Sequence, residues 1–332
     1  MQLDSVRNLK ASVQAKLVAP LSQEAVRRAT LALSAQSMGN LAGPRRVVAL
    51  GITRNSRRDF QLAVRVQRPE LVDSPQVAAI VRQARGEADV RYIGRLAKRV
   101  VPWNRKNVRP LRIGTSIGHF KITAGTLGCF VTRRADAALL ILSNNHVLAN
   151  ENDAKAGDAI LQRGTFDGGT RPADVVGKLA GFVRLKKSGA NLVDAALASI
   201  NPSLGTNLSA IKGIGTLTGQ GPAFLDEGTA VHKLGRTTGV THGKVTAFEL
   251  DNLVVGYDIG DLRFDDQIEI EGAGPDAFSA GGDSGSLIVD AEGRGVALLF
   301  AGGDQGGSNG KGLTYASPIR AVLAALKGDL AF

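Results

Sequence analysis

Residues 278–290 read FSAGGDSGSLIVD, and the interpretation of the chain starts from this stretch. In it Ser284 stands among glycines and is followed at once by an apolar run. Glycines on both sides allow backbone dihedral angles that other residues rarely adopt, so the N–H groups of Gly282 and Ser284 are expected to point toward one position. This arrangement is typical of an oxyanion hole. A serine beside it needs a histidine base and an orienting carboxylate to become a nucleophile.

The chain contains four histidines, which limits the choice of base. His146 lies in LILSNNHVL, residues 140–148, where the end of an apolar strand delivers a side chain to a cleft. His119 lies inside a predicted strand and His242 in a glycine-rich turn, which favours core or surface roles for both. His232 alternates with apolar residues in a strand and is a weaker candidate for a substrate pocket. The sequence therefore favours His146 as the base.

The orienting carboxylate is harder to choose, because spacing alone leaves several aspartates after His146 open. These are Asp153, Asp158, Asp167, Asp174 and Asp194. Asp194 differs in its setting, since it opens the run DAALA in an otherwise apolar strand. Burial of a charge there is costly unless a fixed donor meets it, and a histidine Nδ1–H is such a donor.

From Gly114 onward the sequence consists of short β-like runs separated by glycine turns, and the first clear helical pattern after them covers residues 318–327. About ten to twelve strands at this spacing predict an all-β barrel or a pair of barrels. Functional side chains would then lie on loops where the barrels meet.

The N-terminal part has a different pattern. Apolar residues recur at helical spacing over residues 5–36, which predicts one or two amphipathic helices. A strand over 46–52, a strand over 60–66, a helix over 75–85 and a strand over 89–93 predict a small α/β domain. We therefore divide the chain into a helical segment (1–40), a small basic α/β domain (41–112, with a cationic linker over 95–112) and an all-β domain (113–332).

Three motifs, SNNHV (143–147), NLVDAALA (191–198) and GGDSGS (281–286), resemble the His, Asp and Ser motifs of chymotrypsin/trypsin-like serine proteases, in that order. The resemblance covers roughly residues 114–325. It implies a double β-barrel in which Ser284 attacks a peptide carbonyl, His146 transfers the proton, and Asp194 orients His146. It also implies an oxyanion hole formed by the N–H groups of Gly282 and Ser284, and no metal or cofactor.

Within this family, KLGRTTG (233–239) and the SNNH motif look most similar to an intracellular branch that includes the plant NARROW LEAF proteins and their bacterial relatives. That branch carries a small α/β domain ahead of the protease. Cys129 is the only cysteine, so no internal disulfide forms, and no run approaches the ~18 apolar residues that span a bilayer. These features predict a cytoplasmic serine endopeptidase without a membrane segment.

The resemblance also raises the question of how the site is switched on and what it cleaves. Secreted relatives are activated when a newly cut N-terminus pairs with the aspartate before the serine, here Asp283. No such cleavage site is visible near Gly114, which favours an internal cation and control by the N-terminal region or by assembly. The predicted pocket disfavours an Arg or Lys P1 residue and favours a small or apolar one. Its residues are Phe278, Ser279, Ala280, Phe300, Ala301 and Gly302, with Thr314 nearby.

Charge is distributed unevenly along the chain. Residues 1–112 hold 22 Lys and Arg against 7 Asp and Glu, whereas the remainder carries a net charge of −4 within a total of +11. Such asymmetry is consistent with an acidic partner for the basic part, such as a regulatory protein, a second copy of the chain, nucleic acid or the acidic part of the same chain, and equally with a solvated basic face that has no partner. Two alternatives therefore stay open: a catalytically weak scaffold of the same fold, and a protease that its basic N-terminal segment recruits to nucleic acid.

Overall fold

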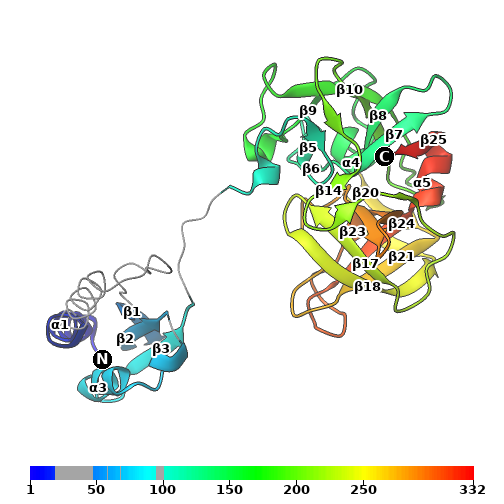
Figure 1. Cartoon of the computed structure of the whole chain (residues 1–332). Helices are drawn as coiled ribbons and strands as arrows, with labels where there is room; N and C mark the ends of the chain where they lie inside the picture. The colour runs from blue at the N-terminus through cyan, green and yellow to red at the C-terminus, as the bar shows by residue number, and fades with distance from the viewer. Residues whose placement is uncertain (19–47, 58, 68, 95–100) are drawn as a thin grey trace, which may run out of the picture. The chain divides into compact units, whose positions relative to one another are not determined.

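The computed structural model describes residues 1–18, 48–57, 59–67, 69–94 and 101–332 of the chain (Figure 1). The chain divides into two compact units, Met1–Val100 and Val101–Phe332, each of which is described by itself. Of the helices predicted over residues 5–36, the part from residue 19 onward lies outside the described residues.

The first unit is a small α/β domain, as predicted. Strand β1 pairs with β2 antiparallel and β2 with β3 parallel, and α3 makes the crossover between β2 and β3. Ser74 caps α3 by accepting a hydrogen bond from the N–H of Val77. Alternate residues of the strands pack with both helices on one face of the sheet. The elements are α1 (Leu3–Val13), a π-helical turn (Gln14–Val18), β1 (Val48–Ser56), β2 (Asp59–Val66), a 3-10 turn (Pro69–Leu71), α3 (Pro75–Gln83) and β3 (Ala88–Tyr92).

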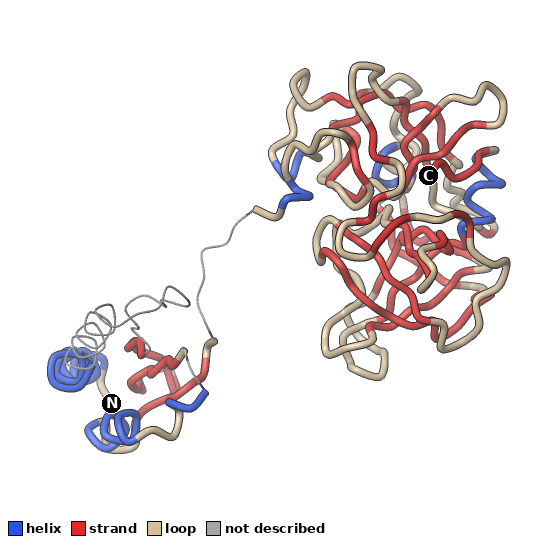
Figure 2. The backbone as a smooth tube through the Cα atoms, viewed as in Figure 1, coloured by secondary structure: helices blue, strands red, loops and turns tan. Residues whose placement is uncertain are grey.

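The second unit begins with an eight-stranded sheet in the order β25-β7-β8-β12-β10-β9-β5-β6, which curls into an open half-barrel (Figures 1 and 2). Its central strand β8 is almost entirely buried because neighbouring strands and the core cover both of its faces. The strands are β5 (Ser116–His119), β6 (Gly125–Thr126), β7 (Cys129–Arg133), β8 (Leu139–Ser143), β9 (Ala159–Leu161), β10 (Val175–Phe182), β12 (Ala196–Ser199) and β25 (Gly328–Ala331).

The rest of the second unit is a closed barrel. Strands follow the order β23-β22-β17-β18-β21-β24, and the additional pairing of β23 with β24 closes the ring. The predicted double β-barrel is therefore confirmed. The strands are β16 (Gly219–Gln220), which extends the sheet beside β23, β17 (Ala230–Gly235), β18 (Gly239–Leu250), β21 (Gln267–Gly272), β22 (Leu287–Asp290), β23 (Arg294–Gly302) and β24 (Leu313–Pro318).

Short elements connect the two barrels. A β19–β20 hairpin reaches the first barrel, because β20 pairs in parallel with β11, which lies just before Asp194. The remaining elements are 3-10 turns (Trp103–Arg105 and Thr165–Asp167), β4 (Leu111–Arg112), α4 (Asn145–Leu148), β11 (Ala190–Asn191), β13 (Thr206–Asn207), β14 (Ala210–Ile211), β15 (Gly215–Thr216), β19 (Leu253–Tyr257), β20 (Gly260–Phe264) and α5 (Ile319–Leu326).

Residues 101–112 belong to the second unit and pack against the rest of it. Asn104 is buried, and its side-chain amide donates hydrogen bonds to the carbonyl oxygens of Gly114 at 3.1 Å and Gly235 at 3.0 Å. The guanidinium of Arg105 donates to the carbonyl oxygen of Arg236. The linker predicted over residues 95–112 is therefore structured from residue 101 onward.

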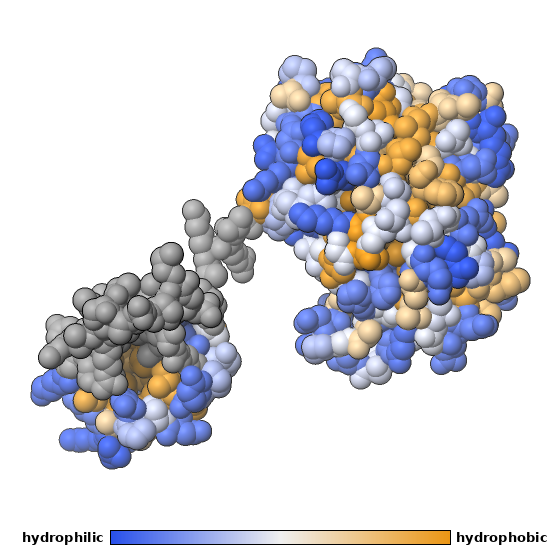
Figure 3. All heavy atoms as spheres, in the orientation of Figure 1, coloured by the Kyte–Doolittle hydropathy of each residue, from blue (hydrophilic) through white to orange (hydrophobic). Residues whose placement is uncertain are grey.

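The outer surface of the second unit mixes hydrophilic and hydrophobic residues on the face shown in Figure 3. In the parts of the chain that the structure describes, no helix has the length and apolar character needed to cross a membrane.

Candidate active site

His146 lies in the first turn of α4, directly after the buried strand β8. The strand is fixed at its end because the hydroxyl of Ser143 donates a hydrogen bond to the carbonyl oxygen of Thr126 at 2.7 Å. Asn145, two residues after Ser143, is buried, and its side-chain amide donates a hydrogen bond to the carbonyl oxygen of Val183 at 2.8 Å. The imidazole of His146 remains 22% exposed, so it can contact a bound substrate.

Asp194 meets His146 as the sequence predicts. Its carboxylate is fully buried, and its Oδ2 lies 2.6 Å from Nδ1 of His146. Its Oδ1 accepts hydrogen bonds from the backbone N–H groups of Asn145 at 2.5 Å and His146 at 3.3 Å. This placement follows from strand pairing, because Ala196 of β12 lies opposite Ser143 of β8. The cost of burying the charge is thus offset by fixed donors.

Tyr257 is a member of the site that the sequence interpretation missed. Its hydroxyl donates a hydrogen bond to Oδ2 of Asp194 at 2.7 Å, and its ring contacts His146 edge to face at 5.9 Å between centroids. Burial, followed by the charge of Asp194, raises the pKa of Tyr257, so this hydroxyl stays a donor. An aromatic residue at the end of a short strand before the turn Asp258-Ile259 was the only available signal in the sequence.

The electrostatics of the pair favour a charged imidazole. Burial lowers the pKa of His146, but the charge of Asp194, its hydrogen bond and the charge of Glu151 together raise this pKa above its ordinary value of 6.5. Glu151 is held nearby because its carboxylate accepts a hydrogen bond from the N–H of Ile259 at 3.1 Å. An imidazole with a raised pKa is a better proton acceptor once it is neutral.

Ser284 lies beside His146, and both residues line two neighbouring cavities of about 620 and 540 Å³. The hydroxyl of Ser284 donates a long hydrogen bond of 3.5 Å to the carbonyl oxygen of Phe300. Within the described residues, no hydrogen bond joins Ser284 to His146. The two side chains thus share a cleft without a hydrogen bond between them. Catalytic hydrogen bonds are often long in ligand-free enzymes.

The backbone around Ser284 forms a turn with two unused donors. Gly282 has φ +92°, a conformation that favours glycine, and its carbonyl oxygen accepts a hydrogen bond from the hydroxyl of Thr126 at 3.0 Å. Across the described part of the chain, no acceptor meets the N–H of Gly282 or of Ser284. Two such donors beside the Ser284 hydroxyl are the kind of group that an oxyanion hole requires.

Asp283 points away from the cleft into a buried network. Its Oδ2 lies 3.3 Å from Nζ of Lys233, and both side chains are fully buried. The carboxylate also accepts hydrogen bonds from the N–H groups of Thr237 at 2.7 Å, Thr238 at 3.2 Å and Ala280 at 3.0 Å, and from the Thr238 hydroxyl at 2.7 Å. Burial lowers the pKa of Lys233, and Asp283 opposes this shift. Lys233 is therefore the internal cation at Asp283.

The larger cavity contains most of the predicted pocket residues. Ser279, Ala280, Phe300, Ala301 and Gly302 line it, as do Ala277, Gly281 and Gly303. At one wall the hydroxyl of Ser279 lies 2.6 Å from that of Thr314.

Phe278 differs from the prediction. It is 1% exposed, belongs to the core of the closed barrel and does not line the cavity. The ammonium of Lys233 lies 5.5 Å from the centre of its ring. The chain bends at Phe278, which packs in the barrel core, while Ala277 and Ser279 on either side of it line the cavity.

The other histidines lie elsewhere. His119 is buried and its Nε2 lies 3.1 Å from the carboxylate of Asp158. His232 and His242 contact each other on β17 and β18, and neither lines the two cavities. Among the residues that the structure describes, no group of three or more His, Cys, Asp or Glu side chains has the arrangement of a metal site.

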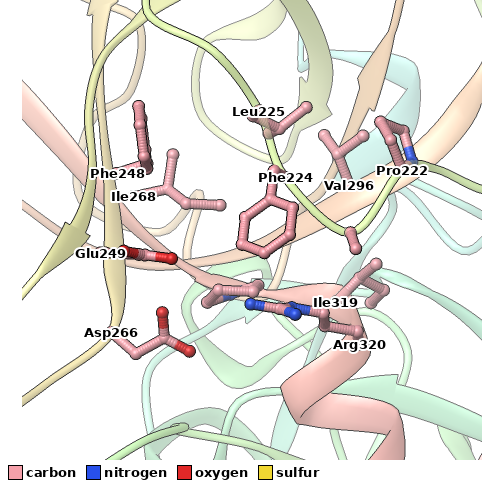
Figure 4. A pocket seen from close by; sticks show the side chains of 12 residues that line it. Pro222, Phe224, Leu225, Phe248, Glu249, Asp266, Ile268, Val296, Ile319 and Arg320 are labelled. Carbon is pink, nitrogen blue, oxygen red and sulfur yellow. The ribbon is translucent and has the colours of Figure 1, made fainter.

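A further pocket lies between the segment 222–225, strands β18 and β21 and the start of α5 (Figure 4). The exposed rings of Phe224 and Phe248 border it, and the guanidinium of Arg320 lies 5.0 Å from the centre of the Phe224 ring. Its volume of about 20 Å³ is enough for about one water molecule. It contains none of the candidate site residues.

Searches against protein families and curated proteins find no match for this chain. Solved structures with a similar fold include a glutamic acid specific serine protease (21% identity, TM-score 0.48), which covers 67% of this chain and 100% of its own. An alpha-lytic protease homolog N4 (19%, TM-score 0.47) and Thermobifida fusca protease A (18%, TM-score 0.45) each cover 67% of this chain and 99% of their own. At these identities the likeness concerns the fold alone.

Proposed function

We propose that the chain is a serine endopeptidase in which His146, Asp194 and Ser284 form the catalytic triad. The observation that carries this proposal is the buried Asp194–His146 pair at 2.6 Å, which opens onto the cleft that also holds Ser284 and two unused N–H groups. In the described residues, no other set of three side chains brings a buried carboxylate, a partly exposed imidazole and a hydroxyl together at one of the cavities described above.

The chemistry follows from these positions. The Oγ of Ser284 attacks the carbonyl carbon of the peptide while Nε2 of His146 takes the hydroxyl proton, and the N–H groups of Gly282 and Ser284 hold the resulting oxyanion. His146 then gives the proton to the leaving amine, and water hydrolyses the acyl-enzyme by the same route. Asp194 stabilises the charged imidazole and keeps its Nδ1–H directed away from the serine. No step requires a metal or cofactor.

The cavities favour cleavage within a polypeptide. Ser284 and His146 line both the 620 Å³ cavity with Ser279 and Gly302 and the 540 Å³ cavity with Thr123, Ala124 and Gly282. A substrate chain can therefore extend on both sides of the nucleophile. In the larger cavity, the small side chains of Ser279, Ala280 and Ala301 support a preference for a small P1 residue.

The buried Lys233–Asp283 pair supports a site that is formed without a cleaved N-terminus. Residues 1–112 then act in regulation, substrate docking or assembly, and the buried Cys129 fits a reducing compartment such as the cytoplasm. Intact mass of the active enzyme tests this part of the proposal. An active population in which every molecule has lost the N-terminal region would contradict it.

A fluorophosphonate probe tests the triad directly, because it labels only an activated serine. We expect labelling that peptide mapping assigns to Ser284, that Ser284→Ala abolishes, and that the exposed Ser203→Ala leaves unchanged. Comparison of new N-termini in a proteome treated with wild type and with Ser284→Ala would then give the cleaved sequences and the P1 preference.

A second candidate is a catalytically weak scaffold, which the missing Ser284–His146 hydrogen bond favours. In that case the protein would bind peptides through the same cleft but react slowly with the probe. Absence of labelling in a folded wild-type protein, together with peptide binding that Ser284→Ala retains, would support the scaffold over the enzyme.

A further inference from the structure

Two histidines face each other on the closed barrel, outside the candidate active site. His232 of β17 and His242 of β18 are direct partners in the antiparallel register. Their Nδ1 atoms lie 2.7 Å apart, and the rings meet edge to face with centroids at 4.7 Å. His242 is exposed and His232 partly exposed, so ions from solvent can reach the pair.

Within the described part of the chain, the two imidazoles contact each other and are not tied to the charged groups nearby. Asp290 is itself paired with Arg294 at 2.8 Å and so does not occupy the histidines. A contact of 2.7 Å between two Nδ1 atoms requires one of them to carry a proton. When that proton moves to Nε2 of the same ring by tautomerisation, both Nδ1 atoms have a lone pair available for an ion, and a small rotation of the rings directs the two at it.

We propose that His232 and His242 form a binding site for a divalent first-row transition-metal ion such as Cu²⁺, Ni²⁺ or Zn²⁺. Imidazole nitrogen is a preferred ligand of these ions, and bonds of about 2.0–2.1 Å place two neighbouring ligand atoms ~3 Å apart. The observed separation needs to open by only a few tenths of an ångström. Water completes the coordination, because the pair supplies two ligands.

The ion would cross-link a hairpin that matters for the proposed active site. Beyond His232 the same two strands continue through Lys233 to the turn residues Thr237 and Thr238, which donate hydrogen bonds to Asp283. The strand register holds both imidazoles in place before the ion binds, whereas in an unfolded chain they are separated by a flexible loop. Binding therefore favours the folded hairpin and stabilises the protein against unfolding.

Isothermal titration of the full, untagged chain with Cu²⁺, Ni²⁺ or Zn²⁺ tests the site, with Mg²⁺ as a control that should not bind. We expect one ion per chain, bound most tightly for Cu²⁺. His232→Gln and His242→Gln should each weaken binding by about 10²-fold, because the second imidazole acts at a high effective concentration. His146→Gln, which removes the partly exposed histidine of the cleft, should leave the affinity unchanged.

Electron paramagnetic resonance of the Cu²⁺-loaded wild type reports the ligands without relying on any variant. Two coordinated imidazole nitrogens are expected, and melting curves without metal establish that each variant is folded. A single coordinated nitrogen in the wild type, or equal affinity in the wild type and both folded glutamine variants, would overturn the proposal. Loss of binding in His146→Gln alone would place the ion in the cleft instead.

Discussion

Replacement of Lys233 by methionine should inactivate the proposed site, although Lys233 itself does not contact the substrate. The ammonium of Lys233 lies 3.3 Å from Oδ2 of Asp283 and donates a 2.6 Å hydrogen bond to the hydroxyl of Thr238, with both charged side chains fully buried. Methionine fills a similar volume but leaves the carboxylate without an opposite charge. Asp283 directly precedes Ser284, so any movement of its backbone displaces the nucleophile and the N–H groups beside it.

The magnitude follows from burial. Removal of one partner from a buried ion pair typically costs about 3–5 kcal/mol. Four hydrogen bonds to Asp283 from Thr237, Thr238 and Ala280 remain in the variant, so we expect the lower end, ~3 kcal/mol of unfolding free energy. A domain of ordinary stability survives such a loss, since typical values are about 5–15 kcal/mol. Displacement of one oxyanion donor lowers kcat by ~10²–10³.

Urea unfolding and the rate of fluorophosphonate labelling measure the two effects separately. Lys244→Met is a matched control, because Lys244 pairs with Glu271 at 2.9 Å but is 50% exposed, so its loss should change the urea midpoint much less than the loss of Lys233. Labelling of Lys233→Met at the wild-type rate, with an unchanged urea midpoint, would refute the assignment of Lys233 as the internal cation.

The remaining predictions concern the groups around the triad. His146 must be neutral to accept the proton and its pKa is raised above 6.5, so kcat/KM should rise with pH through an apparent pKa above that value. Glu151→Gln removes one of the charges that raise this pKa and should shift the rise in kcat/KM to lower pH. A pH profile that does not move in this variant would contradict the reasoning. Tyr257→Phe removes a hydrogen bond to a buried carboxylate and should lower kcat at least ~10-fold with KM nearly unchanged, whereas equal kcat would argue against a positioning role. Gly235→Ala should abolish labelling, because a Cβ would lie 2.3 Å from Oδ1 of Asp283, and an active variant would show that the turn can relax.

Much of the fold and of the proposed triad could be predicted from the sequence, because the signals for them come from residues close together in the chain. His146 follows a strand whose apolar run marks its end, and Asp194 is an isolated charge in an apolar segment that needs a donor. Both signals come from neighbours within a few residues. The register of β8 with β12, which brings the two together, is a contact between distant segments that these local signals do not specify.

The missed features depend on contacts between distant segments. Tyr257 reaches Asp194 only because β20 pairs with β11, and a five-residue strand before a turn does not reveal its partner. The inward position of Phe278 depends on its packing against residues of distant strands, such as Val245 and Ile270, which the local sequence does not reveal. The burial of Lys233 could have been predicted from the sequence. This lysine lies on the same face of an apolar strand as Val231, so its charge needs a buried counter-charge.

Both barrels contribute residues to the proposed site. The positions of these residues relative to one another therefore depend on the core that the barrels share. His146 and Asp194 come from the half-barrel, whereas Ser284 and the Lys233–Asp283 pair come from the closed barrel and Tyr257 from the connecting hairpin. One continuous apolar cluster contains Leu142 of the first barrel together with Leu234, Leu287 and Leu298 of the second. Because protein interiors are close-packed, a cavity in this cluster would weaken the packing that holds the two barrels, and with them Ser284 and His146, in place.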